Sequence, residues 1–264
     1  MHTSGCTGAW PVGKPVQPML RQTPGPPVRW LAGRLAVVTG ASRGIGAATA
    51  AAVAAAGAHV VLAARDRQAL DGVAGQIKDA GGQATPVPTD VSDEAAVERL
   101  FAEVARIGQL SALVCAAGVL TNALFAETTS KMWHETLGVN LTGTFLCCRA
   151  AFTAMVPAGE GRIVNIASLS GVYATEKFPG LAAYNVSKYG VVGLTEAVAV
   201  EGKKHGISAI CLSPGAVDTE MLRRANPALR PGLTPDDVGE LIAALLDSPL
   251  APVSGANIPL FSNA

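Results

Sequence analysis

The chain has 264 residues, of which 49% are hydrophobic and 15% charged, so it holds enough apolar material for one large buried core. Its 20 basic and 20 acidic side chains cancel, which argues against nucleic acid or an acidic membrane surface as partners attracted by overall charge. Five cysteines without a Cys-x-x-Cys pair and four scattered histidines favour a reducing, cytoplasmic compartment and predict neither a disulfide framework nor a metal site.

Residues 1–30 are rich in proline and glycine and show neither a helical nor a strand period. They also lack the apolar core of a secretory signal. We therefore expect a disordered or loosely packed extension, followed by a single catalytic domain over residues 31–264.

A short apolar run at 35–38 leads through a glycine-rich turn into an alanine-rich helix at 47–56. The glycines are Gly40, Gly44 and Gly46, with the spacing Gly-x-x-x-Gly-x-Gly. A strand, a glycine-rich turn and the beginning of a helix, in this order, bring backbone N–H groups together around a phosphate. Gly40 would allow the tight turn, Gly44 a close approach of the backbone to a pyrophosphate, and Gly46 close packing of the helix. A glycine-rich turn without a ligand is the alternative.

Strands and helices are predicted to alternate along the rest of the chain. Further strands are expected at 60–64, 84–88, 110–116, 161–166, 208–212 and 255–260, and helices at 69–80, from residue 92, and at 131–155, 182–205 and 234–247. This alternation of apolar strands with helices predicts an α/β fold, a doubly wound, Rossmann-like parallel sheet of seven strands. Ligands of such sheets bind beyond the carboxyl ends of the strands. The glycine turn, Asp90, Gly118, Ser168 and Pro214 can therefore share one cleft.

Tyr184 and Lys188 are four residues apart, so they lie on one face of the same predicted helix. A nearby ammonium favours the phenolate, so we expect Lys188 to lower the pKa of Tyr184. A phenol tuned in this way can exchange a proton with a carbonyl or alcohol oxygen. Taken alone, such a pair is more often part of a solvated helix face, and Ser168 alone is only a polar strand end.

The chain resembles the classical short-chain dehydrogenase/reductase family over about residues 33–260. The resemblance rests on the combination of the glycine turn, a serine after the fifth strand and Tyr-x-x-x-Lys on the next helix. The resemblance implies a catalytic tetrad of Asn140, Ser168, Tyr184 and Lys188. In that tetrad Ser168 polarises the substrate carbonyl and Tyr184 is the acid/base, while Lys188 also holds the nicotinamide ribose and Asn140 anchors a water of the proton relay. Ser170, nearer to Tyr184 in sequence, is a weaker candidate for the serine.

The resemblance also implies a nicotinamide dinucleotide as the cofactor. Asp90 and Val91 are expected at its adenine, and Thr219 at its carboxamide. The full set of residues that it assigns to the cofactor is Gly40, Ser42, Arg43, Gly44, Ile45, Gly46, Arg65, Asp90, Val91, Ala117, Gly118, Asn140, Tyr184, Lys188, Pro214, Gly215, Val217 and Thr219.

The choice between NAD(H) and NADP(H) can be argued from charge. An acidic residue at the end of the second strand would bond the ribose 2′-hydroxyl and repel a 2′-phosphate. This position is Ala64, and it is followed by Arg65, while Arg43 adds a second guanidinium from the glycine turn. Guanidinium groups suit phosphate oxygens, so we expect NADP(H) to be preferred over NAD(H). The alternative is that Arg65 pairs with Asp66 or with solvent.

The predicted function is an NADP(H)-dependent oxidoreductase that interconverts a ketone and a secondary alcohol. By resemblance to 3-oxoacyl-[acyl-carrier-protein] reductases, the carbonyl substrate would be a small molecule or an acyl thioester. Arg223, Arg224 and Arg230 could meet an acidic carrier, although a solvated basic loop explains them equally well. Family members assemble through the helices at 131–155 and 182–205, so we expect a homodimer or homotetramer. The alternative function is a non-catalytic NADP-binding regulator or scaffold.

Two departures from the family's pattern concern other parts of the cleft. Ala116 stands where the family's Asn-Ala-Gly motif has its asparagine. This position concerns the support of the sheet and the adenine side of the cofactor site. The segment 257–260 lacks the usual Asp-Gly-Gly after the last strand. This second departure concerns one edge of the substrate pocket and the subunit contacts.

Overall fold

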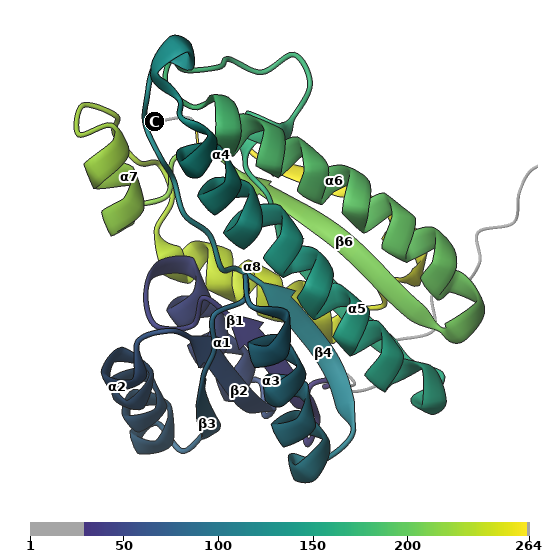
Figure 1. Cartoon of the computed structure of the whole chain (residues 1–264). Helices are drawn as coiled ribbons and strands as arrows, with labels where there is room; N and C mark the ends of the chain where they lie inside the picture. Colours follow the sequence, from purple (N-terminus) through teal and green to yellow (C-terminus); the bar gives the residue numbers. More distant parts are fainter. Residues whose placement is uncertain (1–28, 263–264) are drawn as a thin grey trace, which may run out of the picture.

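Seven short apolar runs form the strands of one parallel sheet, which confirms the predicted doubly wound α/β fold (Figure 1). The computed structural model describes residues 29–262. In chain order the strands are β1 (Leu35–Thr39), β2 (His59–Ala64), β3 (Gln83–Pro88), β4 (Leu110–Cys115), β5 (Gly161–Ile166), β6 (Ile207–Pro214) and β7 (Asn257–Leu260). Their order in the sheet is β3-β2-β1-β4-β5-β6-β7, and every neighbouring pair is parallel.

The helices connect consecutive strands and begin mostly at polar caps. They are α1 (Gly44–Ala55), α2 (Arg67–Asp79), α3 (Glu94–Ile107), α4 (Ser130–Leu137), α5 (Gly143–Met155), α6 (Ala182–Gly202), α7 (Glu220–Ala225) and α8 (Pro235–Asp247). The carboxylates of Asp66 and Asp93 cap α2 and α3, and Thr234 with Asp237 forms a capping box at α8. These side chains satisfy N–H groups that the first helical turn leaves without partners.

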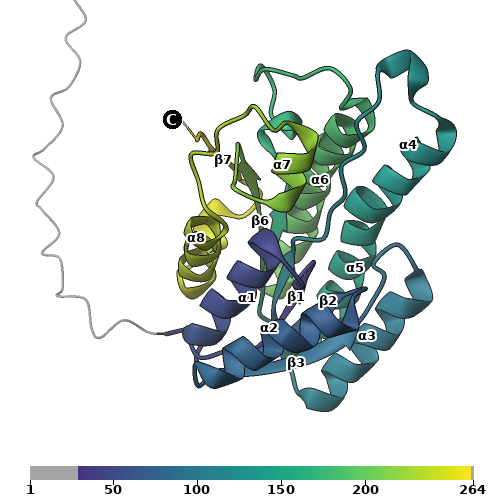
Figure 2. The same ribbon diagram turned by 90° about the vertical axis from the view of Figure 1, so that its left-hand side faces the viewer.

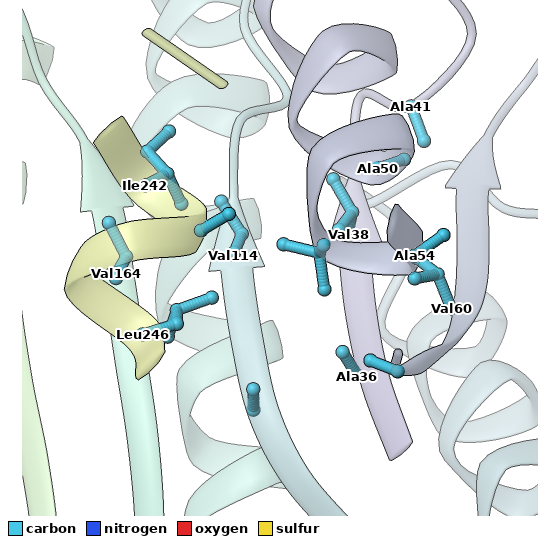
Figure 3. Packing of buried hydrophobic residues seen from close by; sticks show 14 of the residues in the cluster. Ala36, Val38, Ala41, Ala50, Ala54, Val60, Val114, Val164, Ile242 and Leu246 are labelled. Carbon is cyan, nitrogen blue, oxygen red and sulfur yellow. The ribbon is translucent and has the colours of Figure 1, made fainter. Parts of the chain in front are cut away.

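Both faces of the sheet are buried, because successive side chains of a strand point to opposite sides. From β1, Ala36 and Val38 pack with α1 and α8, as Figure 3 shows. Leu35 and Val37 pack instead with residues of α3 and α5. Figure 2 shows α1 and α8 on one side of the strands and α4 and α5 on the other.

The strand order reverses between β1 and β4. The chain builds the sheet from β1 through β2 to β3, and then returns to add β4 on the other side of β1. At such a point the two following connections leave in opposite directions, which opens a crevice at the carboxyl ends of the strands. The glycine-rich turn after β1 and the segment after β4 therefore border the same crevice.

The helix predicted at 131–155 is continuous, but it contains a widened turn. This π-helical turn, η2 (Gly138–Thr142), joins α4 to α5. Such turns are rare and occur frequently at functional sites. By length and composition alone the helical segment Ser130–Ala158 could cross a membrane, yet 44% of its most apolar window is buried inside the protein. Core helices of non-membrane domains pass the same test, so the segment is weak evidence for a membrane span.

The first described residues pack against the end of the sheet opposite the crevice, at the beginning of β5 and the end of α8. The indole ring of Trp30 lies 3.7 Å from the guanidinium carbon of Arg162, and the Leu31 N–H donates to Asp247 at 2.9 Å. The extension predicted for residues 1–30 lies outside the described residues except for Arg29 and Trp30. The described cysteines, Cys115, Cys147, Cys148 and Cys211, are buried free thiols.

Candidate active site

The glycine turn after β1 leaves no room for side chains at two of its glycines. A Cβ at Gly46 would lie 2.2 Å from the carbonyl oxygen of Gly40, and one at Gly40 would lie 2.7 Å from the Ala117 nitrogen. Gly40 and Gly44 also have positive φ angles of 66° and 55°, which glycine adopts without strain. No side chain caps α1, and its first turn contains no acidic residue. Its N–H groups therefore remain available to an anion.

A cleft of about 760 Å³ lies over this turn, at the reversal of the strand order. Its walls come from the turn, the ends of β2, β3 and β4, and the segment after β6. Residues expected at the cofactor that line it are Gly40, Ser42, Arg43, Gly44, Ile45, Gly46, Arg65, Asp90, Val91, Ala117, Gly118 and Thr219. A tight glycine cradle with free N–H groups and two guanidinium groups fits a phosphorylated dinucleotide.

Three further residues expected at the cofactor, Pro214, Gly215 and Val217, lie at the end of β6 or just after it and do not line this cleft. The Gly215 N–H donates to the Leu260 oxygen at 2.9 Å, which joins this segment to β7. Val217 is buried in the core and pairs with Leu233, so its side chain is not available to a ligand. Any contact of Pro214, Gly215 or Val217 with a cofactor would therefore involve mainly the backbone.

Arg43 and Arg65 both line the cleft, but their guanidinium groups have different acidic neighbours. Arg43 donates from Nη1 to Oε2 of Glu220 at 3.0 Å. Asp66, which the sequence analysis considered as a partner of Arg65, instead accepts from the Ala69 N–H at 3.0 Å and caps α2. The pKa of Asp90 is lowered, chiefly by its hydrogen bond from Ser92 and also by the charge of Arg65. Arg65 thus faces the cleft next to Asp90.

Asn140 lies in the widened turn η2 and is fully buried. Its Oδ1 accepts from the Val119 N–H at 2.8 Å, and its Nδ2 donates to the Val119 oxygen at 2.9 Å and to Oγ of Ser187 at 3.0 Å. Asn140 therefore ties the segment after β4 to α6, which carries the Tyr-Lys pair. Sequence reasoning missed Val119 and Ser187, because no local pattern marks a hydrogen bond between segments so far apart.

Lys188 is buried, with 5% of its surface exposed, and its Nζ donates to the Ile166 oxygen at 2.8 Å. Burial lowers its pKa to about 8. A Cβ at Gly118 would lie 3.8 Å from this Nζ and 3.5 Å from Oδ1 of Asn140. Gly118 is therefore the point at which the cleft meets two of the four tetrad residues.

Tyr184 and Ser168 complete the group of tetrad side chains. Burial raises the pKa of Tyr184, and a hydrogen bond with the Ser168 side chain opposes this shift. The prediction that Lys188 lowers the pKa of Tyr184 is wrong for this structure. The Lys188 Nζ lies 5.6 Å from the centre of the Tyr184 ring, and the loss of water around a phenolate outweighs any attraction. A phenol with a raised pKa keeps its proton, so Tyr184 is in the form that can donate to a carbonyl, although the shift makes it the weaker acid.

Ser168 rather than Ser170 is the serine next to Tyr184. Its side chain caps the short 3₁₀ helix η4 (Leu169–Gly171) by accepting from the Ser170 N–H at 3.1 Å. Ser168 follows β5 at the same sheet edge as the glycine turn. The structure thus brings Ser168 next to Tyr184, Tyr184 near Lys188, and Lys188 and Asn140 next to Gly118, which lines the cleft; the four tetrad side chains themselves do not line it.

Comparison with known proteins assigns the family. The family model described as "short chain dehydrogenase" matches residues 34–230. The chain belongs to the short-chain dehydrogenase family. The "3-oxoacyl-[acyl-carrier-protein] reductase" of Synechocystis sp. is 35% identical over 84% of this chain and 92% of its own length. The "D-threitol dehydrogenase" of Mycolicibacterium smegmatis is 34% identical over 86% of this chain and 91% of its own length.

Solved structures agree with this assignment. A putative NAD(P)-dependent gluconate 5-dehydrogenase from Beutenbergia cavernae, crystallised with NADP at low occupancy, has a TM-score of 0.81 at 36% identity. The match covers 89% of this chain and 98% of that one. A short-chain type dehydrogenase/reductase from Mycobacterium marinum has a TM-score of 0.82 at 32% identity, and the match covers 89% of this chain and 96% of that one. The chain is thus an oxidoreductase of the short-chain dehydrogenase family, which binds a nicotinamide cofactor.

The buried lysine of this short-chain dehydrogenase gives its stability a defined pH dependence. The pKa of Lys188 is about 8 in the folded protein and about 10.4 in an unfolded chain. Between pH 8 and about 10.4 the unfolded state binds more protons than the folded state, so the contribution of Lys188 to the free energy of unfolding rises with pH. Below pH 8 this contribution does not change with pH. We expect the wild type to gain stability relative to Lys188→Met from pH 8 to 10, measured by urea unfolding. Parallel curves for the two proteins would contradict this, and exposed Lys204→Met is the control.

Proposed function

We propose that the protein is an NADP(H)-dependent oxidoreductase that interconverts a ketone and a secondary alcohol, with Tyr184 as the acid/base. The single observation that supports this most strongly is the burial of Lys188 and Asn140 next to Gly118, at the cleft wall, with the Tyr184 ring 5.6 Å from the Lys188 Nζ. A bound nicotinamide would supply or accept the hydride at the substrate carbon.

In this proposal the side chains of the chain position the carbonyl and move its proton. The Ser168 hydroxyl donates a hydrogen bond to the carbonyl oxygen, and Tyr184 donates its phenolic proton to the same oxygen. Lys188 would hold the nicotinamide ribose through its ammonium group, as the family resemblance implies. Asn140 fixes the Val119 backbone and α6 relative to each other through its three hydrogen bonds.

The preference for NADP(H) is proposed from Arg65 and Arg43. We expect kcat/KM to be higher with NADPH than with NADH, and Arg65→Asp to reverse this order, because a carboxylate repels a 2′-phosphate and accepts a hydrogen bond from a 2′-hydroxyl. The measurement is the ratio of the two kcat/KM values for each protein, and Arg67→Asp is a nearby control, since Arg67 pairs with Asp71 along α2. A wild type that prefers NADH, or an unchanged ratio in Arg65→Asp, would refute the preference.

The substrate we favour is a small ketone rather than a carrier-bound thioester. Arg223 pairs with Asp218 and Arg224 with Glu220, so two of the three arginines that could meet an acidic carrier, Arg230 being the third, are already paired with carboxylates. The Synechocystis relative is named as a 3-oxoacyl-[acyl-carrier-protein] reductase, and thioesters therefore belong in the screen. NADPH oxidation should be measured over small diketones, cyclic ketones, sugars and 3-oxoacyl thioesters, and a thioester as the best substrate would overturn this choice.

The alternative, a non-catalytic NADP-binding regulator, finds less support. A protein that only binds the cofactor has no need of a buried lysine, whose burial lowers its own pKa and costs stability. Binding of NADP(H) without turnover of any carbonyl in the screen would favour the regulator.

We further propose a homodimer or homotetramer assembled through the helical segment that contains α4 and α5, and through α6. These helices expose large apolar side chains, Phe145 on α5 and Val186 and Tyr189 on α6. Water-exposed apolar surface of this kind is a common feature of subunit interfaces. A monomeric mass in analytical ultracentrifugation at micromolar concentration would contradict the proposal.

A further inference from the structure

The guanidinium group of Arg43 in the cleft is paired with a carboxylate of α7, a helix that also lines the cleft. Four carboxylates line it (Asp66, Asp90, Asp218 and Glu220) together with three arginines (Arg43, Arg65 and Arg223). Asp66 caps α2, Asp90 accepts from Ser92, and Asp218 pairs with Arg223. Glu220 is the only one of the four with an ion pair to the glycine turn among the residues that the structure describes.

Glu220 begins α7 and reaches the turn from the opposite wall. Its Oε2 accepts from Nη1 of Arg43 at 3.0 Å, across 177 residues of sequence. Its second carboxylate oxygen pairs with Arg224. The preceding residue, Thr219, lies 3.4 Å from the position a Cβ of Gly44 would take. Figure 2 shows α7 next to the beginning of α1. Arg43 is therefore drawn toward α7 rather than toward Arg65 at the end of β2.

We propose that Glu220 is a specificity-determining residue, because it competes with a nucleotide 2′-phosphate for Arg43. The proposal rests on the NADP(H) preference argued above. The expected site of a 2′-phosphate is the end of β2, where Arg65 lies. For Arg43 to join Arg65 there, its ion pair with Glu220 must break. A carboxylate and a phosphate cannot both lie close to one guanidinium without mutual repulsion.

Two consequences follow from this competition. Glu220 lowers the affinity of the cleft for nucleotides that carry a 2′-phosphate, and it does so through Arg43 rather than by simple repulsion of the ligand. Binding of the 2′-phosphate also breaks the ion pair between α7 and the glycine turn, so the phosphate of the cofactor is coupled to a contact of α7. The Arg43 and Glu220 side chains are 70% and 43% exposed, so the effect is small.

The test is a double-mutant cycle with nucleotide fragments as ligands, so that it needs no substrate. Isothermal titration of the full chain with 2′,5′-ADP and with 5′-AMP measures the two affinities in wild type, Glu220→Gln, Arg43→Ala and the double variant. We expect Glu220→Gln to tighten 2′,5′-ADP by about two- to fivefold, the range of an exposed ion pair, and to change 5′-AMP by less. The gain should vanish in the Arg43→Ala background. Glu98→Gln, exposed on α3 and away from the cleft, is the matched control.

The outcomes separate this inference from the proposed function. An unchanged 2′,5′-ADP affinity in Glu220→Gln, or an equal gain in the Arg43→Ala background, overturns the role of Glu220 and leaves the NADP(H) preference in place. A wild type that binds 2′,5′-ADP no better than 5′-AMP overturns the preference. If Glu220→Gln then creates a preference for 2′,5′-ADP, the competition for Arg43 is supported even though the wild-type preference has failed. Glu220→Asp, which shortens the reach to Arg43, should act in the same direction as Glu220→Gln.

Discussion

Replacing Tyr184 by phenylalanine is expected to lower kcat by about 10²- to 10⁴-fold, the contribution of one positioned proton donor. The variant removes only the phenolic oxygen, so the packing of the half-buried ring is kept and the affinity for NADP(H) should change far less than kcat. Steady-state kinetics with the best substrate of the screen and a fluorescence titration with NADPH measure the two quantities.

Tyr189→Phe is the matched control for this experiment. Tyr189 lies on the same helix, and its hydroxyl donates to the Val172 oxygen at 3.0 Å on the protein surface. We expect kcat of this variant to stay close to the wild-type value, within about threefold, because its hydroxyl bonds the Val172 backbone and none of the four tetrad side chains. Turnover that survives Tyr184→Phe undiminished would remove Tyr184 from the mechanism.

Replacing Gly46 by alanine is expected to damage both folding and cofactor binding. The new Cβ would lie 2.2 Å from the carbonyl oxygen of Gly40, so the start of α1 must move away from β1. Overpacking of this kind typically costs about 1–3 kcal/mol. The shifted turn would also misplace the N–H groups that we expect around the pyrophosphate. We expect a lower free energy of unfolding in urea and at least about tenfold weaker binding of NADP(H).

Gly72→Ala separates this clash from the general effect of glycine replacement. Gly72 lies inside α2, and a Cβ there would meet nothing within 4 Å. Alanine is the better helix former, so this variant should gain up to about 1 kcal/mol. If Gly46→Ala also proved neutral or stabilising, the tight contact between α1 and the glycine turn would be refuted.

The amino-acid sequence predicted the order and type of most elements because each is encoded by neighbouring residues. The bounds of β1 and β5 were predicted to within one residue. The long helix at 131–155 was predicted, but its widened turn at Asn140 was not. No residue pattern distinguishes a π-helical turn from the α-helix on either side of it. The turn became visible only with the backbone, together with the contacts of Asn140 to Val119 and Ser187.

The Tyr-x-x-x-Lys spacing, the glycine turn and the alternation of strands and helices were determined by the sequence alone, since each depends on residues a few positions apart. Only the tertiary structure decided the direction of the Tyr184 pKa shift and the partner of Arg43. The first depends on how much water the fold removes from the phenol, and the second on a carboxylate 177 residues away. Desolvation and long-range pairing are properties of segments that meet in space, and a local pattern contains no information about which segments will meet.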